Sequence, residues 1–372
     1  MSIKVGLVGL PNVGKSSFFN SLTGSSVRAE NYPFCTIDPN ISIFNINDTK
    51  ILKLSEVDNP KSIVYPTIEV YDIAGLIKGA SNNEGLGNQF LSHIKEVDII
   101  LNVVRFFKNK NIIHVNENIN PIDDIEIINL ELRLKDLETV EKRIEKISKL
   151  CKSGNESAIK EIEILKKFKK TLENNTDIRN IIDSNSAEEE EKKILKELQL
   201  LSYKPVVYVG NINEDKIELI NNDEIYKDEE IKKFLNAIKI NKEDCIFIPV
   251  EIGTLIKGLS EEEKEENLVY INVWDKMLNK LSNIILKKLN IITFYTSGAD
   301  EVRGWNIKNG ITAKTASGVI HSDFEKNFIK VDVCKFEEYY NAKKNNINPH
   351  FTTFGKEYIM QDGDVVYFKT NA

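Results

Sequence analysis

The chain has 372 residues, of which 41% are hydrophobic, and its net charge is −7 at pH 7. At about 150 residues per domain, this length predicts two or three domains, each able to build its own core. The negative charge excludes a global basic field as the means of attracting nucleic acid or an anionic membrane, so any such contact must be local.

The apolar runs of the sequence predict neither a membrane span nor a secretory signal. The apolar runs fall short of the roughly 20 residues that span a bilayer, so we expect no membrane contact. The first apolar run leads into Gly and Lys instead of a small-residue cleavage site, so we expect no secretory signal. The four cysteines form no C-x-x-C pair and the four histidines share no metal-ligand spacing, which predicts a reducing, cytoplasmic compartment and no zinc.

The first elements predict a parallel α/β sheet. An apolar run over residues 3–8 predicts a strand, and residues 17–23 predict the helix after it. Further strands are predicted at residues 67–71, 99–104 and 205–209. Strands that end at polar residues and alternate with helical stretches are typical of a sheet whose site lies at the carboxyl ends of its strands.

Residues 131–200 are rich in charge, lack Pro and contain a single Gly, which predicts a helical insertion. Apolar residues at spacings of three and four form the seam of a coiled coil: Ile127, Leu130, Leu134, Leu137, Val140, Ile144, Ile147 and Cys151. After Ser153-Gly154-Asn155, a returning helix is marked by Ala158, Ile162, Leu165, Phe168 and Leu172. The insertion is either an arm that touches a partner or a hairpin that is satisfied by its own seam.

A small mixed domain is predicted to close the chain. Short strand-like runs appear at residues 291–295, 328–333 and 365–368. The turn Asp362-Gly363-Asp364 lies between two strand-like runs and predicts a hairpin.

The motif Gly9-x4-Gly14-Lys15-Ser16 is the Walker A pattern, placed between a strand and a helix. Its glycines let main-chain N–H groups turn onto phosphate oxygens, Lys15 reaches the β and γ phosphates, and the Ser16 hydroxyl ligates Mg²⁺. The residues expected to bind the nucleotide here are Asn12, Val13, Gly14, Lys15, Ser16 and Ser17.

A second phosphate signal is Asp72-x-x-Gly75, in which the carboxylate holds Mg²⁺ and the Gly75 N–H meets the γ-phosphate. Thr36 lies where the first switch of a GTPase-like protein supplies another Mg²⁺ contact. Many small GTPases follow this glycine with a Gln that orients the attacking water, but here the residue is Leu76. Hydrolysis is therefore slow, or His114, a backbone carbonyl, a monovalent cation or a partner protein replaces the Gln.

Base recognition is expected after the strand at residues 205–209. A guanine reader needs Asn-Lys-x-Asp, whereas this chain has Asn211-Ile212-Asn213-Glu214. The Lys is absent and the carboxylate is one methylene longer, so the guanine-specific fork is lost, which can cost several kcal/mol of discrimination. The sequence favours adenine.

Taken together, these motifs resemble the Obg-like ATPase (YchF) family of P-loop proteins over nearly the whole chain. The stretches that carry the resemblance are residues 9–16, 31–37, 72–81, 84–91, 111–115, 211–214, 318–326 and 362–364. The resemblance implies a P-loop G domain with a mostly parallel sheet, an inserted coiled-coil arm and a C-terminal β-grasp (TGS) domain. The corresponding segments are residues 1–122 and 204–285 for the G domain, 123–203 for the arm and 286–372 for the TGS-like domain.

The resemblance also implies a function. It predicts a hydrolase that prefers ATP over GTP and acts around the ribosome, with RNA contact through the TGS domain. It makes His114 the leading substitute for the missing Gln, places Phe107 against the adenine, and matches Asn12 to the position at which related proteins coordinate K⁺. Three departures bear on this prediction: Asn83 stands where Gly is usual, Glu251-Ile252-Gly253 alters the last base-contacting loop, and residues 313–317 differ from the usual run.

Two other functions use the same pocket. In the first, the chain is a nucleotide-gated binding module whose turnover is incidental. In the second, it is a conventional GTPase, which predicts tighter binding of GTP than of ATP.

Overall fold

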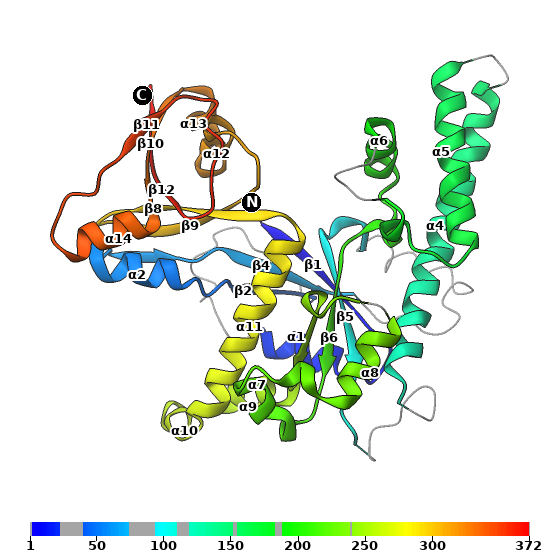
Figure 1. Cartoon of the computed structure of the whole chain (residues 1–372), viewed down its shortest axis with the longest axis horizontal. Helices are drawn as coiled ribbons and strands as arrows, with labels where there is room; N and C mark the ends of the chain where they lie inside the picture. The colour runs from blue at the N-terminus through cyan, green and yellow to red at the C-terminus, as the bar shows by residue number, and fades with distance from the viewer. Residues whose placement is uncertain are drawn as a thin grey trace.

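The structure is a computed structural model that describes residues 2–22, 40–73, 94–109, 119–151, 155–182, 188–238 and 240–371. Figure 1 shows a central body with two projections, one built on the C-terminal sheet and the other a long helical arm. Within the described ranges, no helix combines the length and apolar character needed to cross a membrane.

The central body is built on a six-stranded sheet of order β2-β4-β1-β5-β6-β7. Its strands are β1 (Ile3–Val8), β2 (Ile41–Asn45), β4 (Thr67–Asp72), β5 (Ile99–Arg105), β6 (Val206–Asn211) and β7 (Cys245–Ile248). All neighbours pair in parallel except the edge strand β2, which is antiparallel to β4. The mostly parallel sheet predicted from the sequence is confirmed.

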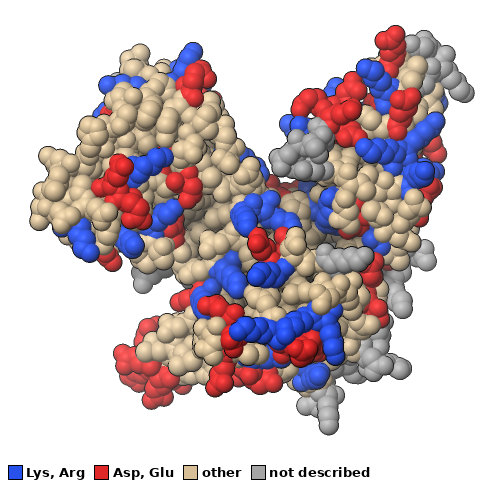
Figure 2. All heavy atoms as spheres, viewed as in Figure 1, with Lys and Arg blue, Asp and Glu red and all other residues tan. Residues whose placement is uncertain are grey.

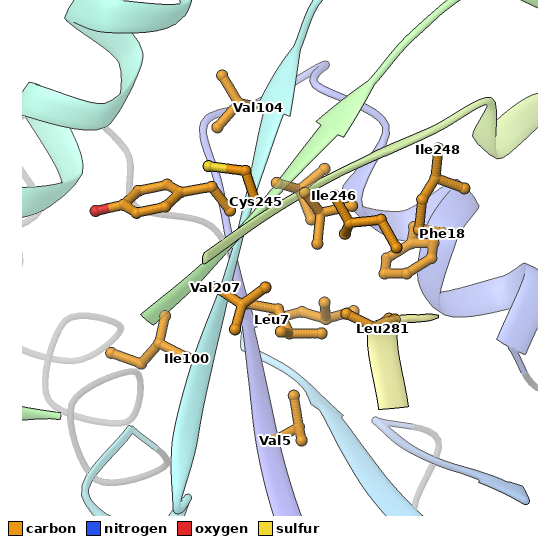
Figure 3. Close-up of a cluster of buried hydrophobic side chains, with 14 of the residues drawn as sticks. Val5, Leu7, Phe18, Ile100, Val104, Val207, Cys245, Ile246, Ile248 and Leu281 are labelled. Carbon is orange, nitrogen blue, oxygen red and sulfur yellow. The ribbon is translucent and has the colours of Figure 1, made fainter. Parts of the chain in front are cut away.

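Helices cover this sheet and bury its apolar strands. They are α1 (Lys15–Leu22), α7 (Ile217–Asn221), α8 (Glu229–Ile238), α9 (Val250–Gly258) and α11 (Leu268–Lys288). The short helix α10 (Glu261–Glu266), which has no buried residue, precedes α11. Figure 3 shows the core, in which Phe18 of α1 and Leu281 of α11 lie among strand residues such as Leu7 and Val207. Every residue of β5 is buried, as expected of a central strand covered on both faces.

The helical arm consists of α4 (Pro121–Cys151), α5 (Glu156–Glu173) and α6 (Glu189–Leu198). From Leu137 to Ile147 the predicted seam is correct, because Val140 and Ile147 are buried with Leu165 and Phe168 of α5 in a core of their own, and Leu137 and Ile144 pack against it. The side chain of Cys151, the last predicted seam residue, lies outside the described part of the structure. The prediction was wrong nearer the sheet, where Leu130 and Leu134 are 42% and 45% exposed.

The start of α4 belongs to the central body, which explains the error in the seam. Ile125, Ile128 and Leu132 are buried in the core of the sheet. This part of α4 therefore turns a different face inward, and Leu130 and Leu134 are left outside it.

The C-terminal projection is a second six-stranded sheet of order β11-β10-β12-β8-β9-β3. Its strands are β3 (Ser62–Val64), β8 (Ile291–Ser297), β9 (Glu301–Lys308), β10 (Phe328–Lys335), β11 (Thr352–Phe354) and β12 (Asp364–Thr370). Its helices are α12 (Ala313–Ile320), α13 (Ser322–Lys326) and α14 (Phe336–Lys344). A sheet that packs around a helix in this way is the β-grasp architecture implied by the resemblance.

The predicted hairpin at residues 362–364 was wrong. Gly363 does turn with a φ of 83°, but the segment before it forms only an isolated bridge, between Ile359 and Thr312. The strand that follows, β12, pairs with β10 and β8. The sheet is therefore ordered by long-range pairing, which a local turn signal does not reveal.

One segment of the N-terminal region lies in the second sheet. Residues 46–66 connect β2 to β4 and contain α2 (Thr49–Asp58) and β3. Strand β3 pairs in parallel with β9, and Ile51 and Leu54 of α2 are buried in a cluster with side chains of the C-terminal strands. In Figure 1, α2 accordingly lies against the C-terminal projection.

Polar contacts hold α2 at both of its ends. Asp48 caps the helix by accepting from the Lys50 N–H at 2.8 Å, and it also accepts from the Tyr295 hydroxyl. At the other end, Asp58 accepts from the hydroxyls of Ser297 and Tyr339 at 2.5 and 2.7 Å. These contacts, together with the side-chain hydrogen bond from Lys343, lower the pKa of Asp58 although burial opposes the shift.

Candidate nucleotide site

The Walker A residues form a loop at the carboxyl end of β1, between Val8 and the first residue of α1. Asn12 and Gly14 have positive φ angles of 64° and 93°, and the Phe18 N–H closes the first helical turn on the Gly14 carbonyl at 2.9 Å. A Cβ atom at Gly14 would also overlap the Asn211 side chain, so this position requires glycine. Because the first turn of α1 carries no acidic side chain, its N–H groups and helix dipole favour an anion.

Two predicted phosphate and metal residues meet above this loop. Asp72 is the last residue of β4 and lies opposite Leu7 of β1, so the sheet places it beside the Walker loop. Its carboxylate forms an ion pair with the Lys15 ammonium. Both side chains are largely shielded from solvent, which strengthens their electrostatic effect on a ligand bound there.

The same residues fit Mg²⁺. The Ser16 hydroxyl is exposed in the first turn of α1, next in sequence to Lys15, which pairs with Asp72. A hydroxyl and one carboxylate are the oxygen donors that Mg²⁺ takes from a protein when phosphates and water complete its shell. Among the residues that the structure describes, no group of three His, Cys, Asp or Glu side chains is gathered to hold a metal by itself.

Asn211, at the end of β6, links three segments around the site. Its side-chain NH₂ donates to the Val13 carbonyl at 3.0 Å, and its side-chain oxygen accepts from the Val250 N–H at 3.3 Å. Its main-chain carbonyl accepts from the N–H groups of Phe106 and Phe107 at 2.8 and 3.0 Å. Asn211 therefore ties the Walker loop to the loops after β5 and β7, and its amide is engaged in holding them.

Phe107 follows β5 and its ring lies beside the Walker loop. Its Cε1 atom is 3.9 Å from the point at which a Cβ atom of Gly14 would sit. The next peptide is held from the other side, since Asn213 accepts from the Lys108 N–H at 2.9 Å. The loops after β5 and β6 thus form one surface next to the phosphate-binding loop.

The remaining residues of the predicted base motif differ in accessibility. The Ile212 side chain is only 3% exposed and lies in the core, and its N–H donates to the Ile248 carbonyl at 3.2 Å. A nucleotide would therefore meet its main chain. Glu214 begins the 3₁₀ turn η5 (Glu214–Lys216) and is half-buried. Ser17 is exposed in the first turn of α1.

Three predicted site residues, Thr36, Gly75 and His114, lie outside the described residues. Conversely, sequence reasoning missed two residues that shape the site, Arg105 and Asn213. Arg105 supports Phe107, and Asn213 holds the Lys108 peptide. The available signal for Arg105 was a single arginine at the end of a strand that is apolar except for Asn102.

A separate cavity of about 780 Å³ lies by the first residues of β6 and β7, which is the opposite edge of the sheet from the Walker loop. Its walls come from the arm, the central body and β9, and they include Arg179, Lys288 and Lys308. Figure 2 shows a hollow between the C-terminal projection and the arm, with Lys and Arg gathered around its floor. The cavity walls also include Asp98 and Asp244, and Arg179 and Lys288 form ion pairs with Asp177 and Asp244.

Comparison with known proteins gives matches along the chain. A family model described as a 50S ribosome-binding GTPase matches residues 4–140. A second model, YchF-GTPase_C, described as a protein of unknown function, matches residues 291–371. The chain is 42% identical to the ribosome-binding ATPase YchF of Bacillus subtilis and 41% identical to that of Escherichia coli O157:H7, each over the whole of both chains.

A solved structure agrees with these matches. The YchF GTPase of Schizosaccharomyces pombe superposes with a TM-score of 0.81 at 36% identity. The superposition covers 99% of this chain and 97% of the yeast chain.

Proposed function

Because the chain belongs to the YchF family of P-loop nucleoside triphosphate hydrolases, we propose that it is a Mg²⁺-dependent hydrolase that prefers ATP over GTP and works as a ribosome-associated switch in the cytoplasm. The observation that carries the proposal is the contact between Lys15 and Asp72 over the first turn of α1. It joins a phosphate-binding cation and a metal-binding carboxylate that are far apart in the sequence.

The described residues account for the binding of the triphosphate. The N–H groups at the start of α1 and the Lys15 ammonium would hold the phosphate oxygens and stabilise the charge that develops during cleavage. Ser16 and Asp72 would hold Mg²⁺, which supplies neutralisation of the β and γ phosphates. Lys15→Ala should lower the hydrolysis rate by at least about a hundredfold, because it removes one fixed charge from the transition state.

The preference for adenine rests on what the base loop lacks. A carboxylate that accepts from guanine N1–H and N2–H₂ has to be short and held in place, but here the position is the longer Glu214. The Lys of a guanine reader is replaced by Ile212, whose side chain is in the core. The loop therefore lacks the groups with which a GTPase binds guanine more tightly than adenine.

A competition experiment tests this preference directly. ATP and GTP are titrated against one labelled nucleotide in the presence of Mg²⁺, with tighter binding of ATP expected. Glu214→Asp should shift the ratio of affinities toward GTP, whereas Asp215→Asn, on the exposed neighbouring position, should leave it unchanged. Tighter binding of GTP by the unmodified protein would instead establish a conventional GTPase.

His114 is proposed to orient the attacking water, since Leu76 has no group that can do so. His114→Ala should slow single-turnover hydrolysis while leaving ATP affinity within about twofold. Hydrolysis at the unmodified rate would remove His114 from the mechanism and leave a backbone carbonyl, K⁺ near Asn12, or a partner as the remaining groups.

Ribosome association is proposed from the relatives, which are named ribosome-binding, and Lys and Arg side chains, with Asp and Glu among them, surround the hollow in Figure 2. RNA contact through the C-terminal domain belongs to the same proposal. Cosedimentation with ribosomes at increasing salt is the test, because contacts with phosphates weaken steeply as salt rises. A variant that binds ATP but cannot hydrolyse it separates the two roles: full biological function in that variant would favour a nucleotide-gated binding module.

A further inference from the structure

Arg105 is a buried arginine at the carboxyl end of β5, a strand hydrogen-bonded on both sides within the central sheet. Only 1% of its surface is exposed, and it is among the largest fully buried side chains of the described residues. Burying a guanidinium is costly unless its charge and donors are engaged. A cation at this place therefore needs a structural or functional reason.

Arg105 makes two hydrogen bonds and a ring contact with the segment that follows it. Its Nε donates to the Phe107 carbonyl and its Nη2 to the Asn109 carbonyl, both at 3.3 Å. Its Cζ atom lies 4.4 Å from the centroid of the Phe107 ring. A planar guanidinium can stack on a ring and donate in its own plane at once, which a lysine ammonium cannot do.

The rest of the segment is fixed independently. The Phe106 ring packs edge-on against Phe234 and Phe247, with centroid distances of 4.9 and 5.3 Å. The Phe107 N–H is held by the Asn211 carbonyl. The main chain at Phe107 is thus anchored, and the freedom that remains is the orientation of its ring.

We propose that Arg105 is a positioning residue for the purine: its guanidinium supports one side of the Phe107 ring, so that the ring is held in place to stack on the base. This inference rests on the proposed function and takes from the family resemblance that the adenine lies against Phe107. It extends that function by naming the group that preorganises the base contact. Burial lowers the pKa of Arg105, and the charge of Asp124, in the first turn of the arm helix α4, opposes that shift.

The test compares a ligand with a base to one without a base. Arg105→Lys keeps the charge but removes the planar support, and it should weaken ATP binding about tenfold, the size expected from losing one base–aromatic stacking contact. The affinity for tripolyphosphate, which has no base, should stay the same. Arg303→Lys is the matched control, because Arg303 also stacks on a ring, that of Trp305 at 3.9 Å, but lies in the C-terminal sheet.

A double-mutant cycle with Phe107→Ala decides how Arg105 acts. If Arg105 works through Phe107, adding Arg105→Lys to Phe107→Ala should weaken ATP binding no further. An additional tenfold loss in that background, or an equal loss for tripolyphosphate, would overturn the proposal. So would a single Arg105→Lys variant that binds ATP as the unmodified protein does.

The single variant Phe107→Ala distinguishes a failure of this inference from a failure of the proposed function. If that variant binds ATP normally, the base does not lie on Phe107 and this inference fails, whereas the proposed function fails only if the unmodified protein does not bind and hydrolyse ATP. Should Arg105→Lys not fold, as judged by circular dichroism, Arg105→Gln takes its place, and it too should weaken ATP binding about tenfold with tripolyphosphate unaffected, because it also lacks the guanidinium that supports the ring. Unchanged ATP binding in a folded Arg105→Gln protein would overturn the proposal.

Discussion

The base of the arm contains a buried carboxylate whose titration can be measured. Asp136 of α4 is 2% exposed and accepts from the N–H groups of Leu201 and Ser202 at 2.8 and 2.7 Å, which fastens α4 to the turn before β6. Burial raises the pKa of Asp136 from 3.8 to about 6, although the hydrogen bonds from Ser202 and Leu201 and the charge of Arg179 oppose the shift.

The direction of this shift sets the pH dependence. Since the pKa is higher in the folded chain, the stabilisation linked to this group is fully present below pH 3.8 and is lost as the pH rises through about 6. A rise of about two pKa units corresponds to about 3 kcal/mol, or about a hundredfold in the equilibrium for local opening. The effect is confined to the contact between α4 and the turn at residues 201–203.

Hydrogen exchange measures that opening at the two amides themselves. Exchange of the peptide containing Leu201 and Ser202 is followed from pH 4 to pH 7 and corrected for the intrinsic rate, in the unmodified protein and in Asp136→Asn. Asn does not titrate and cannot accept both bonds, so its protection should be lower by a pH-independent amount. The difference in protection between the unmodified protein and Asp136→Asn should shrink as the pH rises above 6. An advantage that is constant, or that grows with pH, would refute the reasoning.

Three other substitutions test the packing and the site. Phe168→Ala should lower the stability of the arm by about 3–5 kcal/mol, because the ring is fully buried between α4 and α5, and protease cleavage within the arm is the measurement. Leu134→Ser should change stability by less than about 0.5 kcal/mol in the same assay, since 45% of Leu134 is exposed. A large loss of stability would show that Leu134 packs in the coiled-coil seam. Gly14→Ala should abolish Mg²⁺-dependent ATP binding without unfolding the chain, because the new methyl group would displace Asn211. Unchanged binding would contradict the described geometry of the loop.

The phosphate-binding part of the site could be predicted because its signals are local. The spacing from Gly9 to Ser16 fixes a loop between a strand and a helix whatever surrounds it. The meeting of Lys15 and Asp72 followed from one further rule, that the carboxyl ends of neighbouring parallel strands share an edge. The family resemblance supplied the overall architecture.

The sequence-based predictions failed where contacts between distant segments of the chain determine the structure. The spacing of apolar residues along α4 does not show that the start of this helix packs on the sheet. Leu130 and Leu134 were therefore predicted to lie in the coiled-coil seam, although both are exposed. Arg105 was not among the predicted site residues, because the apolar pattern of its strand does not reveal which groups its guanidinium contacts. Residues 46–66 carry no motif, and only strand pairing with β9 reveals where they belong.

That pairing has a consequence for dissecting the molecule. An excised fragment of residues 291–371, the extent of the C-terminal family model, would lack β3 and expose the backbone edge of β9, where an open edge invites association between copies. It would also uncover the cluster now filled by Ile51 and Leu54. A fragment meant to stand alone should instead carry residues 46–66 on a linker. The chain passes between the two sheets three times, from β2 to α2, from β3 to β4 and from α11 to β8, and a cut before β8 removes only the last of these connections.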